Sequence, residues 1–287
     1  MKAPLEMPLW DLPKGKDFGT ALHYVFEHLD PTASDLSAEV GRAVDAHVSP
    51  AMLKGHRDKL IAGLLQILET PMGTLWDDLS LRQIPKTSRL EEVRFDAMLP
   101  EGDVLSVPNT KAIGDYIASV VDSKDPLREY ALLLSESEEG VPLRGTLNGS
   151  IDALLHLSSA PHKFLISDYK SNWLRDPNDE PPLERYSPEN LWTAMSVSHY
   201  QLQALIYGVA SYRYLRSRGM SMAEANQSIA GFAYLFVRGI VGSVNTPVQK
   251  TSRLDFFVGQ RYGVSSWSSA PYPTFWSGLS DMLLDAR

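Results

Sequence analysis

The stretch LNGSIDALLHLSSAPHKFLISDYKSNWL, residues 147–174, decides the fold. Two apolar runs flank the turn-forming segment SSAPHK, and this arrangement predicts a β-hairpin. We expect its first strand at about 143–157 and its second at about 164–170. Each strand carries an aspartate among apolar residues, Asp152 in the first and Asp168 in the second. Because a buried charge is costly without a partner, the two aspartates indicate a functional site.

The positions of Asp152, Asp168 and Lys170 on the expected strands are compatible with a metal-dependent active site. Alternation along a strand puts Asp168 and Lys170 on one face and Tyr169 on the other. If the hairpin pairs as expected, Asp152 approaches Asp168, and a divalent cation removes the repulsion between the two carboxylates. Mg²⁺ prefers such oxygen ligands and activates water, and a lysine beside it is suited to stabilise charge on phosphate. A solvated Asp–Lys pair on an edge strand, with Asp152 capping a turn, is the alternative.

Composition narrows the class of protein. The 287 residues fit one large domain, and 44% hydrophobic with 22% charged residues is ordinary for a soluble globular chain. The absence of cysteine excludes disulfides, cysteine-ligated zinc and cysteine-ligated iron–sulfur clusters, and it suits the cytoplasm. No apolar run predicts a membrane span or a signal peptide. The net charge of -8 argues weakly against nucleic acid, so a DNA site needs local basic residues or a partner that supplies them.

Periodicity predicts an α/β fold, with a helical N-terminal part at about 17–85 and an α/β core at about 88–287 within a single domain. The expected strands beyond the hairpin lie at about 88–100 and 228–240, with room for one more within about 241–270. Five helices are expected. The first begins near Asp17 or Thr20, the second spans about 50–70, and the third follows the N-cap Asn109. The fourth spans about 188–218 and ends before Gly219, and the fifth begins around Pro273.

Longer strings in the sequence resemble a known family. Asp152 followed by DYK at 168–170 matches the PD-(D/E)XK nuclease pattern. The segments GTALHYVFEHLD, LNGSID, SDYKSNWL, HYQLQALIYGVASYRYLRSR and GFAYLFVRGI resemble the C-terminal nuclease domain of the RecB family, in the family's order. The resemblance implies a restriction-endonuclease-like core, in which helices flank a central mixed β-sheet.

The resemblance also implies roles for single residues. It implies metal ligands at His23, Asp152, Asp168 and the backbone carbonyl of Tyr169, and it assigns Asp152 and Asp168 to the catalytic set as well. Lys170 matches the catalytic lysine. A lone histidine on an amphipathic helix is otherwise a core or surface residue, so the ligand role of His23 depends on the resemblance.

Three further matches complete the implied catalytic set. Glu92 matches an upstream acidic residue, although a slip of one position would place Glu91 there, and alternation lets only one of them face the site. Gln203 and Tyr207 match a QxxxY element, and their spacing puts both on one helix face, where they are suited to bind phosphate or brace the carboxylates. The alternative is that Tyr207 packs in the core with Gln203 at its edge.

Several basic and aromatic residues have two interpretations. Arg213 and Arg216 share a helix face and, with Arg218, are either phosphate contacts or a solvated helix end. Arg238 likewise is either a phosphate contact or a residue with no role in DNA binding. Trp173 is suited to stack on a DNA base, but packing of the loop onto the core is the favoured role.

The resemblance implies a DNA nuclease, acting as an exonuclease or endonuclease in end processing for double-strand break repair and recombination. It implies Mg²⁺ as the cofactor, with Mn²⁺ as an alternative and Ca²⁺ as a non-catalytic substitute. The implied partners are DNA, RecC, RecD and RecA. The sequence has no GxxxxGK[ST] loop, so we expect no ATP binding.

Two other functions stay open. The chain is alternatively an inactive nuclease-fold scaffold that binds DNA or a protein, or a free-standing phage or CRISPR-type exonuclease. Relatives of the last kind that carry an iron–sulfur cluster need cysteines, which this sequence lacks. Both ends read as tethers, so we expect a domain cut from a longer protein.

Overall fold

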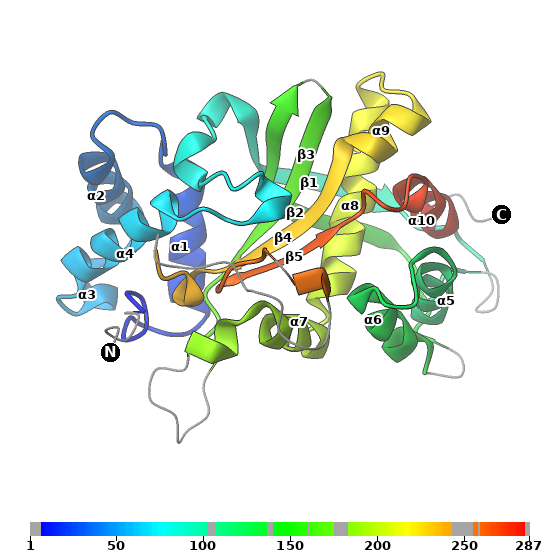
Figure 1. Cartoon of the computed structure of the whole chain (residues 1–287), viewed down its shortest axis with the longest axis horizontal. Helices are drawn as coiled ribbons and strands as arrows, with labels where there is room; N and C mark the ends of the chain where they lie inside the picture. The colour runs from blue at the N-terminus through cyan, green and yellow to red at the C-terminus, as the bar shows by residue number, and fades with distance from the viewer. Residues whose placement is uncertain are drawn as a thin grey trace.

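A five-stranded sheet lies at the centre of the computed structural model (Figure 1). The structure describes residues 7–102, 107–136, 140–159, 161–174, 183–242, 255–257 and 259–284. The strands are β1 (Arg89–Met98), β2 (Thr146–Ser159), β3 (His162–Lys170), β4 (Ile229–Phe236) and β5 (Val264–Ser268), in this order across the sheet. β3 and β4 run parallel, and every other neighbouring pair is antiparallel. The expected mixed sheet and the hairpin at its centre are confirmed.

Helices cover both faces of the sheet. They are α1 (Lys16–His28), α2 (Leu36–His47), α3 (Pro50–Leu53), α4 (Arg57–Glu69), α5 (Thr110–Val120), α6 (Pro126–Ser135), α7 (Pro188–Val197), α8 (Tyr200–Ser217), α9 (Met222–Ser228) and α10 (Phe275–Leu284). Within the described part of the chain, none of them combines the length and the apolarity that crossing a bilayer requires.

Two apolar cores lie on opposite faces of the sheet, because neighbouring strand residues point opposite ways. Leu165 and Leu235 join the core under α1, α2 and α4. Ile166 and Tyr234 join the core under α5, α6, α7, α8 and α10. The two groups of helices accordingly lie at opposite sides of the sheet in Figure 1. The helical N-terminal part therefore shares a core with the sheet.

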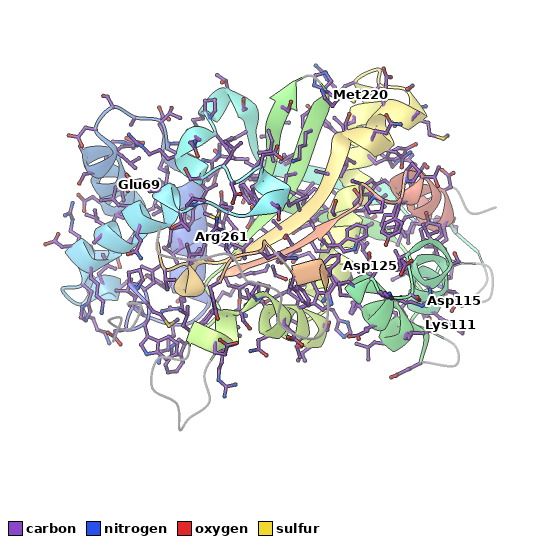
Figure 2. All side chains as sticks on the ribbon, in the orientation of Figure 1. Glu69, Lys111, Asp115, Asp125, Met220 and Arg261 are labelled. Atoms are coloured by element: carbon purple, nitrogen blue, oxygen red, sulfur yellow. The ribbon has the colours of Figure 1, made fainter. Side chains whose placement is uncertain are left out.

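The second core extends to the C-terminal helix through a buried carboxylate. Asp125, labelled in Figure 2, caps α6 by accepting a hydrogen bond from the amide of Leu127 at 2.8 Å. It also accepts hydrogen bonds from Trp267 Nε1 on β5 at 2.9 Å and from the Tyr272 hydroxyl at 2.7 Å. These bonds tie α6, β5 and the segment before α10 together.

Two expected helices are each divided in the structure. The helix at about 50–70 is wrong as a single element, because Lys54 and Gly55 take left-handed conformations, with φ of 47° and 88°, between α3 and α4. The helix at about 188–218 is also wrong as a single element, because His199, with φ of 53°, separates α7 from α8. Gly219 follows the end of α8, with φ of 97°, as its C-terminal signal predicts.

Other elements fall close to expectation or were missed. Asn109 caps α5 by accepting a hydrogen bond from the amide of Ala112 at 2.8 Å. β5 is the additional strand, and residues 243–254 and 258 of that segment lie outside the described residues. Pro273 precedes α10 rather than lying in its first turn, and 285–287 are also outside the described residues. The sequence reading missed the short helices α2, α6 and α9.

Candidate active site

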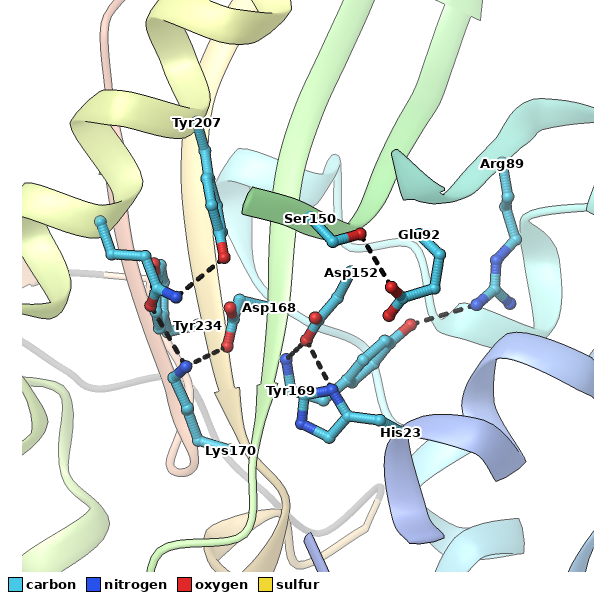
Figure 3. A network of polar contacts seen from close by, with 11 residues as sticks. His23, Arg89, Glu92, Ser150, Asp152, Asp168, Tyr169, Lys170, Tyr207 and Tyr234 are labelled. Carbon is cyan, nitrogen blue, oxygen red and sulfur yellow. Dashed lines mark hydrogen bonds and ion pairs between the residues drawn. The ribbon is translucent and has the colours of Figure 1, made fainter. Parts of the chain in front are cut away.

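The hairpin register brings the two aspartates together. The ladder between β2 and β3 pairs Ala153 with Ser167, and the next step along it sets Asp152 opposite Asp168. At this step a side chain takes the place of the backbone acceptor: Asp152 Oδ2 accepts a hydrogen bond from the amide of Tyr169 at 2.8 Å. Figure 3 shows the two carboxylates side by side on neighbouring strands. The approach expected from the sequence is therefore present.

His23 reaches the same point from α1. Its Nδ1 lies 3.2 Å from Asp152 Oδ2, and 32% of its side chain is exposed. The helix can come this close because Gly19 faces the chain just after β3. A Cβ at Gly19 would lie 2.9 Å from Ser171 Oγ, which leaves little room for a larger residue. Tight packing of α1 against β3 thus positions His23.

Glu92 enters the site through a local distortion of β1. The ladder pairs Glu91 with Ala153 and Val93 with Ile151 but omits Glu92, whose φ is 50°. A left-handed backbone costs a residue other than glycine roughly 1–3 kcal/mol and is often found at functional sites. The Ser150 hydroxyl donates a hydrogen bond to Glu92 Oε2 at 2.8 Å. This local distortion therefore directs the carboxylate towards Ser150 in the middle of β2.

Three ligand atoms converge as a result. One atom each of His23, Glu92 and Asp152 lies within 4.8 Å of the others. Asp168, which the resemblance also assigned to the metal, lies outside this group, and its Oδ1 is 2.6 Å from Lys170 Nζ. The carbonyl of Tyr169 stays a predicted ligand. The geometry thus groups His23 and Asp152 with Glu92, and Asp168 with Lys170.

The two adjacent glutamates have different environments. Glu91 Oε1 lies 2.7 Å from Arg89 NH2, and the side chain of Arg89 is fully buried. The same NH2 donates a hydrogen bond to the Tyr169 hydroxyl at 3.1 Å. Tyr169 in turn stacks on Phe26 of α1, with 4.3 Å between the ring centroids. Glu91 therefore helps to fix the end of β3, while Glu92 joins His23 and Asp152.

A cage of polar and aromatic side chains holds Lys170. Gln203 Oε1 accepts hydrogen bonds from Lys170 Nζ at 3.3 Å and from the Tyr234 hydroxyl at 3.1 Å. Gln203 Nε2 donates to the Tyr207 hydroxyl at 2.8 Å. The ammonium also lies 4.3 Å from the centroid of the Tyr200 ring, a cation–π distance. Figure 3 shows Lys170 between Asp168 and this network.

The sequence reading missed some of these supports. Tyr234 carries a hydroxyl inside the apolar run GFAYLF, and Ser150 shares the NGSID segment with Asp152. Those polar atoms were the available signals. Their partners depend on the parallel pairing of β3 with β4, which sets Tyr234 beside Asp168, and on the left-handed backbone at Glu92.

The site shifts the proton affinities of its groups. Burial raises the pKa of Asp168 to about 6 against the opposing charge of Lys170, and the charge of Asp152 adds to the rise. Burial lowers the pKa of His23, but the hydrogen bond to Asp152 and the charges of Asp152 and Asp168 outweigh it, so the pKa is raised. Burial and the two aspartates also raise the pKa of Tyr207, which stays a neutral hydroxyl.

The donor set suits a hard divalent cation. Carboxylate oxygens are the preferred ligands of Mg²⁺ and Mn²⁺, and imidazole is a common ligand of transition metals. Asp168 Oδ1 is buried without a hydrogen bond of good geometry from a described residue, although Lys170 lies close to it. A cation between these groups would offset the repulsion among Glu92, Asp152 and Asp168.

Other candidate residues have structural roles. Arg238 is buried, and its guanidinium donates hydrogen bonds to the backbone carbonyls of Ser171 at 2.9 Å, of Leu12 at 3.3 Å, and of Leu9 and Pro13. It therefore anchors the N-terminal segment and is not accessible to phosphate. Arg216 NH1 donates to the carbonyl of Met220 at 2.6 Å, beyond the end of α8.

Trp173 packs as the favoured interpretation has it. Its ring lies 5.2 Å from that of Trp10, centroid to centroid, and the ammonium of Lys14 sits over its face. Arg213 NH1 lies 3.4 Å from Ser280 Oγ on α10, within the helix layer.

Comparison with known proteins gives relatives of one kind. No protein-family model matches the chain. The RecBCD enzyme subunit RecB of Mycolicibacterium smegmatis is 37% identical over 268 residues, which are 92% of this chain and 24% of that subunit. RecB of Mycobacterium tuberculosis is 38% identical over 292 residues, 98% of this chain and 25% of the subunit. RecB of Escherichia coli is 28% identical over 239 residues. The chain spans about a quarter of the length of the mycobacterial relatives.

Proposed function

Nearly all of this chain is homologous to a quarter of RecB, so the chain belongs to the RecB family. From this premise we propose that it is a metal-dependent deoxyribonuclease. The reaction proposed is hydrolysis of phosphodiester bonds during DNA end processing, in double-strand break repair and recombination. The observation that carries the proposal is the convergence of His23, Glu92 and Asp152 beside the Asp168–Lys170 pair.

The proposed cofactor is Mg²⁺, with Mn²⁺ as an alternative and Ca²⁺ as a substitute that does not support cleavage. His23, Glu92 and Asp152 are the residues that would hold it, with Asp168 adjacent. When bound, a divalent cation offsets charge on a phosphoryl oxygen and makes water a stronger nucleophile. The chain's own contribution is the placement of these ligands and of Lys170.

Lys170 is the proposed charge-stabilising residue. Its ammonium is held by Asp168 and Gln203 with 13% of its side chain exposed, so it is fixed in orientation and still reachable. In this position it can donate a hydrogen bond to the attacking water or to a phosphoryl oxygen as negative charge builds up. Gln203 orients Lys170, and Tyr207 in turn holds Gln203.

The proposed partners follow from the same premise. RecC and RecD are proposed because the relatives carry the name RecBCD enzyme subunit RecB. RecA is proposed as a further partner from the resemblance of the sequence alone. The net charge of -8 favours delivery of the DNA by other parts of a complex. A cytoplasmic location stays a prediction.

A cleavage assay tests the proposal. Single-stranded and duplex DNA are incubated with the chain in Mg²⁺ or in chelator, beside Asp168→Ala and Lys170→Ala. We expect Mg²⁺-dependent cleavage by the wild type and none by either variant. The matched control is Lys111→Ala, which breaks an exposed ion pair of 2.7 Å with Asp115 (Figure 2).

Each outcome decides between the functions. Undiminished Mg²⁺-dependent cleavage by Asp168→Ala or Lys170→Ala would remove the catalytic assignment. A chain that neither cleaves DNA nor binds Mg²⁺ or Mn²⁺ in calorimetry would be the inactive scaffold instead.

A further inference from the structure

A groove runs between α1 and β1 and opens beside the three converging ligand atoms. Its volume is about 410 Å³, and His23 and Glu92 form part of its wall. The α1 side of the groove is built by residues spaced three or four apart, Lys16, Thr20, His23 and Glu27, which therefore share one helix face. Arg94 lines the groove from β1. The groove is thus continuous with the proposed metal ligands.

Two cationic side chains that have no ion-pair partner among the described residues line the groove. The side chains of Lys16 and Arg94 are exposed, and neither pairs with another residue in the described part of the chain. The nearby acidic residue Glu27 lies 3.6 Å from His28 Nδ1 and so has a basic neighbour. In a chain of net charge -8, two unpaired cations next to a cluster of carboxylates suit an anionic ligand.

An exposed aromatic ring completes the groove. Tyr24 lines it and is 48% exposed. Its ring leans on His47 of α2, with 5.9 Å between centroids and 30° between planes. The His28 ring, whose Nδ1 is 3.0 Å from the Tyr24 carbonyl, lies edge-on to it. The ring is therefore held in place while part of it stays open to a ligand.

We propose that this groove binds the unpaired DNA strand next to the phosphate that is cleaved. Tyr24 stacks on a base, and Lys16 and Arg94 contact the backbone phosphates on either side of His23. A π-face accepts any base but only when the base is unpaired, because bases of a duplex are stacked on one another. The groove therefore makes the site selective for single strands over duplex.

The biological role of the groove rests on the proposed nuclease function, but binding of the strand can be measured without cleavage. It is tested on the 287-residue chain in chelator, where no hydrolysis occurs, by fluorescence anisotropy of a labelled oligothymidylate. Stacking contributes a factor of roughly 5 to 150 in affinity for each base. We expect Tyr24→Ala to weaken binding by such a factor, and Tyr24→Phe to bind as the wild type because it keeps the ring.

A matched control separates stacking from general damage. Tyr214 on α8 is also exposed, at 37%, and does not line the groove. We expect Tyr214→Ala to leave the affinity unchanged. Equal affinities of the wild type and Tyr24→Ala, or equal losses in Tyr24→Ala and Tyr214→Ala, would overturn the proposal. So would a wild-type chain that fails to bind the oligonucleotide at low salt.

The charges are tested by the salt dependence of binding. Each lost phosphate contact reduces the slope of log affinity against log salt by about 0.7 for a single strand. Lys16→Glu and Arg94→Glu should each lower the slope, whereas Lys124→Glu, an exposed cation near α6, should not. Unchanged slopes in both groove variants would contradict the assigned contacts.

Failure of strand binding by the groove and failure of the nuclease proposal give different results in these experiments. If Lys170→Ala still cleaves DNA but Tyr24→Ala loses strand binding, the catalytic assignment fails and the groove stands. If Lys170→Ala is inactive but Tyr24→Ala binds and cleaves normally, the reverse holds. Duplex DNA of the same length should bind equally to the wild type and Tyr24→Ala.

Discussion

Gln203 holds Lys170 in place, and Gln203→Ala tests how much that support contributes to cleavage. The substitution removes three hydrogen bonds: from Lys170 Nζ at 3.3 Å, from the Tyr234 hydroxyl at 3.1 Å, and to the Tyr207 hydroxyl at 2.8 Å. The ion pair of Lys170 with Asp168, at 2.6 Å, is left intact. Lys170 therefore keeps its charge partner but loses the contact that fixes its direction.

The expected magnitudes follow from these contacts. The two bonds to tyrosines join neutral groups and contribute roughly 0.5–1.5 kcal/mol each to the free energy of unfolding. The bond from Lys170 is longer than usual, so we take the lower end of the charged range, about 1.5 kcal/mol. The sum predicts a loss of stability of about 2.5–4.5 kcal/mol. We expect kcat to fall about tenfold, or about 1.4 kcal/mol in the barrier, with KM for DNA unchanged.

The assay measures Mg²⁺-dependent cleavage of a labelled oligonucleotide at saturating concentration, together with urea unfolding. Gln201→Ala is the matched control, because this buried glutamine lies on the same helix and Nε2 donates to the Trp192 carbonyl at 3.1 Å and to Ser196 Oγ at 2.9 Å. It should cost comparable stability and leave kcat unchanged. A wild-type kcat in Gln203→Ala, or the same loss of kcat in Gln201→Ala, would refute the positioning role.

Further predictions concern stability in chelator. The pKa of Asp168 rises from 3.8 to about 6 on folding, so the folded state binds the proton more tightly and loses stability as pH rises through this window. Asp168→Asn should abolish that part of the pH dependence in urea titrations; an unchanged profile would contradict it. Tyr169→Phe removes the hydroxyl that accepts from buried Arg89 and should lower the free energy of unfolding by about 1–3 kcal/mol, measured in the same titration. Gly208→Ala would place a Cβ 1.9 Å from Trp276 and should lower the melting temperature through a cost of about 1–3 kcal/mol or more; an unchanged melting temperature would show that α8 and α10 pack more loosely than described.

Much of the site could be predicted because its geometry is local. The two-residue period of a strand places Asp168 and Lys170 on one face, and the antiparallel pairing of the expected hairpin brings Asp152 towards Asp168. The four-residue spacing likewise places Gln203 and Tyr207 together on α8.

The remaining features depend on contacts between distant parts of the chain. The left-handed turn at Glu92 breaks the alternation from which strand faces are inferred, and nothing in the local sequence announces it. The place of Tyr234 beside Lys170 depends on β4 running parallel to β3 after a connection whose described part includes α7, α8 and α9. The left-handed His199 divides a run of continuous helical periodicity, so α7 and α8 read as one element.

The most direct measurement is anomalous diffraction from a crystal of the chain soaked in Mn²⁺. We predict a peak among the side chains of His23, Glu92 and Asp152, lost in a crystal of Asp152→Ala. A soaked crystal with no ion at this position, or with the manganese elsewhere in the fold, would contradict the proposed metal centre.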